Sequence, residues 1–318
     1  MRKILVTGAL GQIGSELTML LRKEYGNDNV IASSRRYKEG HDKLMESGVF
    51  EILDVTDGKQ ISEIVRKHKI NTIIHLAAVL SAVGEANPQQ AWNINMNGLY
   101  NVLEVAREEG CSVFTPSSIA AFGDSTPKDK TPQDTIQRPN TIYGVTKVAG
   151  ELLCDYYFHK YGVDTRGVRF PGLISYETLP GGGTTDYAVH IYYEALKSKR
   201  YTCFIAKGTK MDMMYMPDAL KAIVQLMEAD PAKLKHRNAF NVTAMSFDPE
   251  EIAASIRKYI PEFELDYDVD PVRQAIAESW PNSLDDSAAR EEWGWSPDYD
   301  LDSMTKDMLE KLKVKLGL

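Results

Sequence analysis

Near its N-terminus the chain reads Val6-Thr7-Gly8-Ala9-Leu10-Gly11-Gln12-Ile13-Gly14. A short apolar run at residues 4–6 leads into this stretch, and residues 15–23 follow it with apolar side chains at helical spacing. Strand, glycine turn and helix in this order are typical of a loop that binds a dinucleotide. The glycine spacing, Gly-x-x-Gly-x-x-Gly, would by itself also fit an ordinary turn between strand and helix. The position directly after an N-terminal strand favours the dinucleotide.

Each glycine of this loop has its own physical task. Gly8 permits the tight turn, Gly11 removes a side chain where backbone must approach a pyrophosphate, and Gly14 lets the helix pack closely on the strand. Gln12 and Ile13 add backbone amides of the first helical turn, where the helix dipole favours phosphate. We predict that all five residues contact a dinucleotide.

Composition excludes several classes of function. The chain has 318 residues, 43% hydrophobic content and a formal net charge of −8, which argues against a surface for nucleic acid or an anionic membrane. No run of 18 apolar residues occurs, and residues 1–3 lead straight into a strand rather than a signal sequence. The three cysteines lie far apart, so neither a structural metal site nor a disulfide framework is expected. These features predict a reduced, cytoplasmic protein.

The first 170 residues alternate strand-like and helix-like segments, which predicts an α/β, doubly wound parallel sheet of the Rossmann type. Further strands are predicted at 29–33, 49–53, 72–76, 112–115 and 164–170, with helices at 60–68, 89–109 and 143–161. After residue 170 comes a Gly-rich loop at 180–186, then helices at 187–197 and 217–228 and a last sheet strand at 239–242. We therefore predict a dinucleotide-binding domain at 1–170, to which 212–245 return. A small α+β substrate-binding cap would comprise 171–211 and 246–318.

Tyr143 and Lys147 stand four residues apart at the start of a predicted helix, which places both on one face. A phenol with a reference pKa near 10 is a poor base, and lowering that pKa by about three units requires roughly 4 kcal/mol. One ammonium at about 4 Å could supply this at an effective dielectric constant near 20. Taken alone, the pair fits a solvated helix face better than a catalytic pair. Ser118, just past the strand at 112–115, could hold a substrate oxygen against the phenol, or could simply cap a helix.

Five motifs in this order resemble the extended short-chain dehydrogenase/reductases, which include nucleotide-sugar epimerases and dehydratases. They are the glycine loop, Ser118, Tyr143-x-x-x-Lys147, His75-Leu76-Ala77-Ala78 and Asn93-Ile94-Asn95-Met96-Asn97-Gly98. The resemblance implies that Tyr143 is the general acid/base, that Lys147 lowers its pKa and holds the nicotinamide ribose, and that Ser118 orients the substrate. It further implies cofactor contacts from Asp54, Val55, Leu76, Ala77, Ala78, Asn95 and Pro171. We interpret His75 as a packing residue.

Within this family the chain is similar to the short-chain type of L-threonine 3-dehydrogenases. The similarity lies in residues 115–119, 169–175, 181–188, 211–218 and 279–281. It implies NAD-dependent oxidation of the β-hydroxyl of L-threonine to 2-amino-3-ketobutyrate. The residues expected to bind this zwitterion are Ser81, Ser118, Thr184, Thr185 and Asp186, with Trp280 as a lid. By resemblance alone, the helices at 89–109 and 143–161 predict a homodimer.

The end of the second strand departs from the NAD pattern. Enzymes of this type usually carry an Asp there for the ribose 2′-hydroxyl, and Ser34 occupies that place, followed by Arg35 and Arg36. The lost carboxylate and the adjacent arginines would tolerate, or attract, the 2′-phosphate of NADP. The family implies NAD, whereas these residues lean mildly towards NADP; we expect NAD, with NADP left open.

Two other functions compete with this interpretation. A nucleotide-sugar epimerase or dehydratase would use the same three site residues with a tightly held cofactor. A non-catalytic dinucleotide sensor would need the glycine loop alone, so the intact set of Ser118, Tyr143 and Lys147 argues against it.

Overall fold

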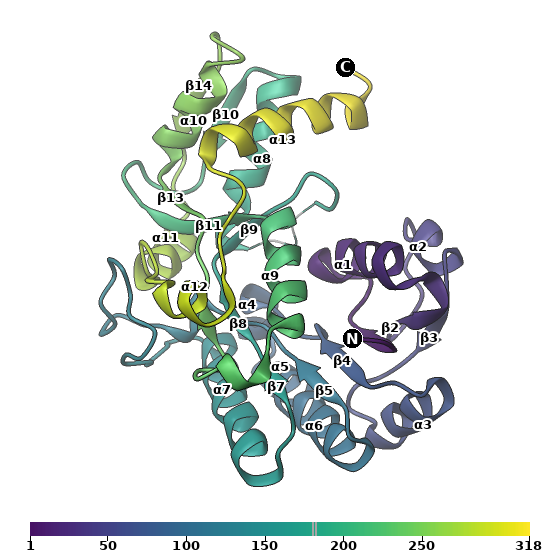
Figure 1. The fold of residues 1–318 in the computed structure, drawn as a ribbon. Helices are drawn as coiled ribbons and strands as arrows, with labels where there is room; N and C mark the ends of the chain where they lie inside the picture. Colours follow the sequence, from purple (N-terminus) through teal and green to yellow (C-terminus); the bar gives the residue numbers. More distant parts are fainter. Residues whose placement is uncertain (180, 182) are drawn as a thin grey trace. The chain divides into compact units, whose positions relative to one another are not determined.

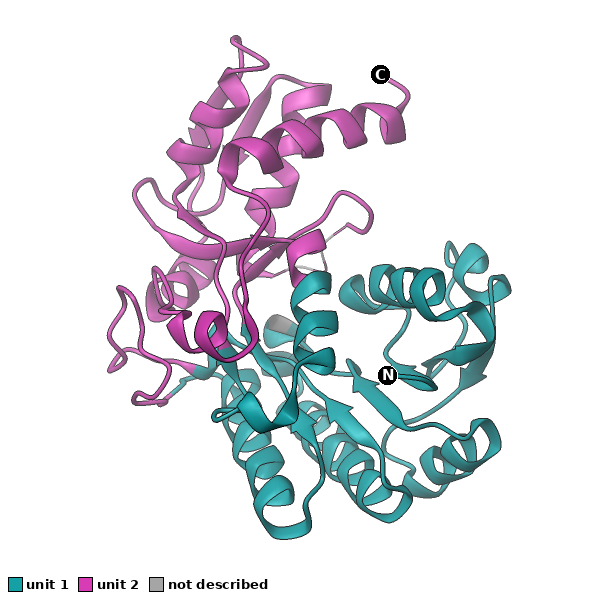
Figure 2. Cartoon of the chain, viewed as in Figure 1, with its two compact units in different colours: residues 1–121, 139–169, 220–240 teal, residues 122–138, 170–219, 241–318 magenta. Residues whose placement is uncertain are grey.

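The structure is a computed structural model that describes residues 1–179, 181 and 183–318. Pro180 and Gly182 of the predicted Gly-rich loop lie outside the described residues. The chain divides into two compact units, shown in Figure 2: unit 1 comprises 1–121, 139–169 and 220–240, and unit 2 comprises 122–138, 170–219 and 241–318. Which unit binds which ligand stays a prediction.

Unit 1 is built on a six-stranded sheet in the order β3-β2-β1-β4-β5-β7, and all its strand pairs are parallel. From β1 the chain adds β2 and β3 on one side and then β4, β5 and β7 on the other, as in the doubly wound Rossmann fold. The predicted fold class is confirmed. The strands are β1 (Ile4–Thr7), β2 (Val30–Ser34), β3 (Phe50–Ile52), β4 (Thr72–His75), β5 (Ser112–Phe114) and β7 (Thr165–Arg166).

Helices cover both faces of this sheet, with α1 on one face and α3, α6 and α7 on the other (Figure 1). The buried core beneath the second group comes from alternate strand residues such as Leu5 and Ile73 and from apolar helix faces such as Ile61–Val65 and Leu99–Ala106. The helices of the unit are α1 (Gln12–Tyr25), α2 (Asp42–Glu46), α3 (Gly58–His68), α4 (Ser81–Ala86), α5 (Pro88–Trp92), α6 (Gly98–Glu109) and α7 (Ile142–Tyr161), with short turns η1 (Asn27–Asn29), η3 (Ile119–Ala121) and η5 (Pro231–Lys233).

Two predicted elements prove to be composite. The helix expected at 89–109 consists of α5, a π-helical turn η2 (Asn93–Asn97) and α6. The strand expected at 164–170 is interrupted at Gly167 and gives β7 and then β8 (Val168–Phe170). A Cβ on Gly167 would lie 2.5 Å from the carbonyl oxygen of Thr115, so this residue must lack a side chain where the two backbones approach.

A second, three-stranded sheet has the order β12-β8-β6, with β6 at Ser117–Ser118 and β12 at Phe240–Asn241. The strand predicted at 239–242 therefore joins this sheet and not the six-stranded one. Ser118, expected just past a strand, is itself the last residue of β6. Its backbone is thereby fixed by β-pairing rather than by a free loop.

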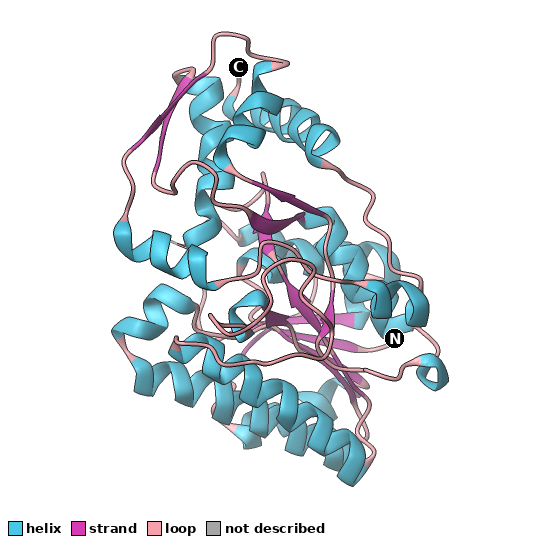
Figure 3. Cartoon of the chain, turned by 90° about the vertical axis from the view of Figure 1, so that its left-hand side faces the viewer, coloured by secondary structure: helices cyan, strands magenta, loops and turns pink. Residues whose placement is uncertain are grey.

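Unit 2 holds two further small sheets, β10-β14 and β13-β11-β9. Its elements are β9 (Gly172–Ile174), η4 (Thr184–Asp186), α8 (Tyr187–Lys197), β10 (Arg200–Cys203), β11 (Met211–Tyr215), β13 (Met245–Phe247), α10 (Pro249–Arg257), β14 (Glu264–Tyr267), α11 (Pro271–Ser279), α12 (Ser287–Trp293) and α13 (Leu301–Leu316). Helix α9 (Met216–Glu228) begins in unit 2 and continues in unit 1. Figure 3 shows the short strands and the helices of the chain by type. Among the described residues, no helix is long and apolar enough to cross a membrane.

Two tyrosines of α8 differ in how their buried hydroxyls are satisfied. Both Tyr187 and Tyr192 are fully buried. The hydroxyl of Tyr192 lies 2.8 Å from Oγ1 of Thr305 on α13, whereas that of Tyr187 has no hydrogen-bond partner among the described residues. A buried polar group without a partner costs about 1–3 kcal/mol.

This contrast predicts opposite effects of the same substitution. Tyr187→Phe removes an unpaired hydroxyl and should raise the free energy of unfolding by about 1 kcal/mol. Tyr192→Phe, the matched control, breaks a buried hydrogen bond and should lower it by about 1 kcal/mol. Urea denaturation of the two variants measures both. Destabilisation by Tyr187→Phe would mean that its hydroxyl has a partner, such as a buried water.

Candidate functional site

The glycine loop joins β1 to α1 through very close backbone contacts. Gly8 has φ +70°, and a Cβ there would lie 2.8 Å from the backbone of Leu76 and Ala77. A Cβ on Gly14 would lie 2.2 Å from the carbonyl oxygen of Gly8. No side chain fits at either position, so the tasks assigned to these two glycines agree with the geometry. The same contact brings the loop against residues 76–77, the other predicted cofactor segment.

The ends of β1 and β4 are locked together by side chains. Thr7 Oγ1 lies 2.9 Å from Nδ1 of buried His75, and the Ala77 amide donates to the same hydroxyl at 3.4 Å. Burial lowers the pKa of His75 to about 3, and the nearby Lys147 ammonium adds to the effect. His75 is therefore neutral and serves to fix the loop that follows β4.

The start of α1 fits a dinucleotide pyrophosphate. Among the described residues no side chain caps the N-terminus at Gly11, and the first turn holds no acidic residue. The side-chain amide of Gln12 is buried, and its Nε2 has no hydrogen-bond partner in the described chain. Open backbone amides, a positive helix end and an unpaired amide donor together form a cradle for an anionic ligand.

The adenosine side of the predicted site lies at the ends of β2 and β3. Ser34 ends β2 beside Ile52 of β3, and its neighbour Ser33 is buried with its hydroxyl on the Val6 carbonyl oxygen. Side chains alternate along a strand, so Ser34 points to the opposite face. Asp54 accepts hydrogen bonds from Thr56, which lower the pKa of its carboxyl, and the charge of Arg35 adds to this shift.

Tyr143 and Lys147 occupy the first turns of α7, as predicted. The Lys147 ammonium lies 5.3 Å from the centroid of the Tyr143 ring and donates to the Pro116 carbonyl oxygen at 2.6 Å. This second contact ties the lysine to the residues just before β6. Ser118 Oγ accepts from the Ala120 amide at 3.2 Å, so the serine also caps the turn η3, the alternative that the sequence left open.

Two residues that the sequence did not single out hold these elements together. Gly144 lies where a Cβ would be 2.2 Å from the Ala120 carbonyl oxygen, so only glycine lets α7 pack this closely on η3. Thr146 accepts a hydrogen bond from Asn95 Nδ2 at 3.1 Å. The glycine within Tyr-Gly-Val-Thr-Lys was a visible signal for the first of these contacts.

Asn95 lies in the π-helical turn η2 and uses its whole amide group. Its Oδ1 accepts from the Val79 amide at 2.7 Å, and its Nδ2 donates to the Val79 carbonyl oxygen at 3.1 Å. It thus links the segment after β4 to α7 through Thr146. A π turn re-aims side chains within a helix and is frequent at functional sites; the apolar periodicity of residues 89–109 gave no sign of it.

The predicted substrate residues lie in both units. Ser81 begins α4 in unit 1. Thr184, Thr185 and Asp186 form η4 in unit 2, where the Asp186 carboxylate accepts from the Gly183 amide and so stabilises its own turn. Trp280, which follows α11 in unit 2, is 8% exposed. Pro171, predicted to contact the cofactor, is buried in unit 2. Their contacts with any ligand stay predictions.

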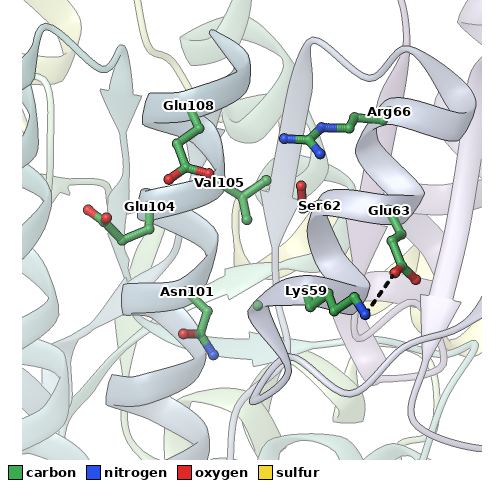
Figure 4. A pocket seen from close by; sticks show the side chains of 9 residues that line it. Lys59, Ser62, Glu63, Arg66, Asn101, Glu104, Val105 and Glu108 are labelled. Atoms are coloured by element: carbon green, nitrogen blue, oxygen red, sulfur yellow. Dashed lines mark ion pairs between the residues drawn. The ribbon is translucent and has the colours of Figure 1, made fainter.

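A hollow of about 360 Å³ lies on the surface of unit 1 between α3 and α6, as shown in Figure 4. Its lining includes Lys59 and Glu63, which form an exposed ion pair at 3.8 Å, together with Arg66 and Glu108. None of the predicted site residues lines it. Exposed ion pairs of this kind are worth little energetically, and we assign no function to this hollow.

Residues 4–243 match the model of the NAD dependent epimerase/dehydratase family. The chain belongs to this family. The match begins at β1, ends just after β12, and so covers unit 1 from residue 4 onward. The predicted resemblance to extended short-chain dehydrogenase/reductases is thereby confirmed.

Several relatives are similar in sequence to this family member along nearly its whole length. An uncharacterised epimerase/dehydratase of Staphylococcus saprophyticus is 60% identical and covers 99% of this chain and 98% of its own. The solved structure of L-threonine dehydrogenase from Clostridium difficile is 71% identical, with a TM-score of 0.98, covering 99% of this chain and 98% of that one. L-threonine dehydrogenase from Phytophthora infestans is 52% identical, with a TM-score of 0.94, covering 98% of this chain and 99% of that one.

The position of Ser34 generates a prediction about cofactor choice. A neutral hydroxyl makes a weaker hydrogen bond to a ribose than a carboxylate and repels no phosphate, so the protein should prefer NAD only loosely. Ser34→Asp should sharpen the preference mainly by weakening NADP, since like charges at close range cost several kcal/mol. The ratio of kcat/KM for the two cofactors measures this in both proteins. An unchanged ratio would show that Ser34 does not face the ribose.

Proposed function

We propose that this family member oxidises L-threonine to 2-amino-3-ketobutyrate with NAD. The observation that carries the proposal is the 71% identity to an L-threonine dehydrogenase over 99% of the chain, combined with the arrangement of Tyr143, Lys147 and Ser118 in unit 1. The rival of the same family is a nucleotide-sugar epimerase. A solved UDP-glucose 4-epimerase of Thermotoga maritima is 21% identical to this chain with a TM-score of 0.85, and a likeness at this identity supports the fold alone.

Tyr143 is the proposed proton acceptor. Oxidation of a secondary alcohol requires loss of the proton from the hydroxyl oxygen and of a hydride from the carbon that bears this oxygen. The Tyr143 phenolate would take the proton. The ammonium of Lys147 lies 5.3 Å from the centroid of the Tyr143 ring and is held by the Pro116 carbonyl oxygen. Ser118 would donate to or accept from the substrate oxygen and keep it aligned with the phenol.

The cofactor would bind in unit 1 along the carboxyl edge of the parallel sheet. The amides at the start of α1 and the Gln12 side chain suit its pyrophosphate, and Asp54 and Ser34 lie at the strand ends expected for its adenosine half. When bound, the nicotinamide supplies the hydride acceptor. NAD is the proposed cofactor, and the prediction for Ser34→Asp addresses its distinction from NADP.

We further propose that Thr184, Thr185 and Asp186 recognise the amino-acid part of the substrate. Hydroxyls and backbone amides suit a carboxylate, and a carboxylate suits an ammonium. The Asp186 carboxylate accepts a hydrogen bond from the Gly183 amide, which restrains the orientation of the side chain. A homodimer stays a prediction; one solved relative with 45% identity is described as a monomeric L-threonine 3-dehydrogenase.

Substrate specificity tests the proposed function directly. L-Threonine should reduce NAD, and D-threonine should do so poorly, because its charged groups and its hydroxyl cannot all be held at once. L-Serine lacks the methyl group, worth about 1–3 kcal/mol in a fitted pocket, and should be a weak substrate. NADH absorbance reports each reaction across a panel of amino acids and nucleotide sugars. Turnover of UDP-galactose without turnover of L-threonine would favour the epimerase, and turnover of neither would favour a sensor.

The role of the tyrosine generates a separate prediction. Tyr143→Phe keeps the ring but removes the proton acceptor, so kcat should fall at least about a hundredfold with little change in NAD affinity. Lys147→Met should lower kcat and weaken cofactor binding together, since one side chain serves both. Steady-state kinetics and NAD titration separate the two effects. Full activity of the Phe variant would remove Tyr143 from the mechanism.

A further inference from the structure

A buried ion pair lies behind the proposed catalytic residues. Glu151 of α7 and Arg169 of β8 form two hydrogen bonds, Nε to Oε1 at 3.0 Å and Nη2 to Oε2 at 2.9 Å, and each side chain is 7% exposed. Glu151 also accepts a hydrogen bond from the hydroxyl of buried Ser117. Such a pair is costly to desolvate, so its presence calls for a reason other than stability.

The position of Glu151 connects this pair to the site. Tyr143, Lys147 and Glu151 follow one another at intervals of four residues and so share one face of α7. Ser117 directly precedes Ser118 in β6, and β8, which carries Arg169, is the neighbouring strand. One carboxylate therefore fixes two of the three strands of this sheet, β6 and β8, to the helix that carries the tyrosine and the lysine.

The charge of Glu151 would disturb the site if it stood alone. Eight helical residues separate it from Tyr143, about 12 Å along the axis. A unit charge at this distance shifts a proton equilibrium by about 0.3 to 1 pH unit at effective dielectric constants of 80 to 20. A lone carboxylate on this face would oppose the ammonium of Lys147; paired with Arg169, it does not.

The surrounding ionisable groups leave this balance intact. Burial lowers the pKa of His75, on β4, and raises that of the Cys154 thiol, on α7, so both are neutral. Burial also raises the pKa of Asp155, whose carboxylate accepts from Asn238 at 2.8 Å. Among the described residues, Lys147, Glu151, Arg169 and Asp155 are charged groups on or against this part of α7. Glu85 of α4 is a further one, because its carboxylate accepts from the Ile142 amide at 2.7 Å. Glu85 is unchanged in every variant below, so it does not affect the differences between their midpoints.

We propose that Glu151 and Arg169 form a charge-neutral clamp. The clamp positions Ser118 through its neighbour Ser117. Because its two charges balance, it does not oppose the electrostatic effect of the Lys147 ammonium on the Tyr143 phenol. Both are positioning residues. The inference rests on the proposed function for its meaning in catalysis. Its electrostatic part concerns only the phenol of Tyr143 and is measurable without any substrate.

The test titrates Tyr143 itself. Protein labelled with ¹³Cζ-tyrosine gives a phenol-to-phenolate midpoint by NMR, with the Tyr143 signal assigned from its absence in Tyr143→Phe. Glu151→Gln keeps an oxygen for Ser117 and Arg169 but leaves the arginine charge, which is permanent. The midpoint should fall by about 0.3 to 1 pH unit. Adding Arg169→Met in the double variant removes that charge and should restore the wild-type midpoint.

Asp164→Asn is the matched control. Asp164 pairs with Arg166 at 2.9 Å but follows the C-terminal end of α7, so about 30 Å of helix separates it from Tyr143. This variant should lose stability without moving the midpoint. A Glu151→Gln midpoint equal to that of wild type, or one that the double variant fails to restore, would overturn the electrostatic role.

Ser117→Ala tests the positioning role separately. It removes the hydroxyl that joins β6 to Glu151 while leaving the ion pair, so kcat should fall about tenfold with an unchanged Tyr143 midpoint. Wild-type kcat in this variant would overturn the link to Ser118. If wild-type protein does not oxidise L-threonine, the proposed function fails, yet the midpoints still decide the electrostatic role, and kcat of Ser117→Ala is then measured with whichever panel substrate is turned over.

Discussion

The architecture of unit 1 depends on backbone approaching backbone without side chains between. At Gly8 a single methyl group would collide with the segment after β4, and at Gly14 it would collide with Gly8 itself. Gly144 repeats this constraint between α7 and η3. These contacts set the strand ends, the start of α1 and the start of α7 at fixed separations. A substitution at any of them would displace several site residues together rather than one.

A second layer of the site consists of polar side chains that hold loops rather than react. Thr7 and His75 fix the segment after β4, Asn95 joins that segment to Thr146 on α7, and Glu151 joins α7 to β6 and β8. These hydrogen bonds are buried, or partly buried at Asn95, and polar groups withdrawn from water are expensive to leave unpaired, so the bonds favour one arrangement. This layer keeps the phenol, the lysine and the serine proposed for chemistry in a fixed arrangement. Such precision matters because a catalytic group displaced by about 1 Å loses much of its effect.

The side chains proposed for chemistry and the ion pair behind them differ in charge. Lys147 contributes an ammonium beside Tyr143, Ser118 contributes a hydroxyl, and the ion pair of Glu151 and Arg169 contributes no net charge. Proton transfer from an alcohol at neutral pH requires that the phenol be favoured as an anion. Burial keeps His75 and Cys154 uncharged, so neither adds a charge near the phenol. The lysine beside the phenol also donates to the Pro116 carbonyl oxygen, so its position is tied to the residues before β6.

The sequence by itself determined the fold class, the family and the places of Tyr143 and Lys147, because glycine spacing, apolar alternation and a four-residue helical interval are local properties. Tertiary structure alone decided the rest. The π turn at Asn95 arises where packing overrides helical periodicity, and the break at Gly167 arises from the carbonyl of Thr115, which directly follows β5. Ser118 belongs to a separate sheet, and Glu151 meets an arginine 18 residues away. Such contacts join residues distant in the chain, so no local pattern encodes them.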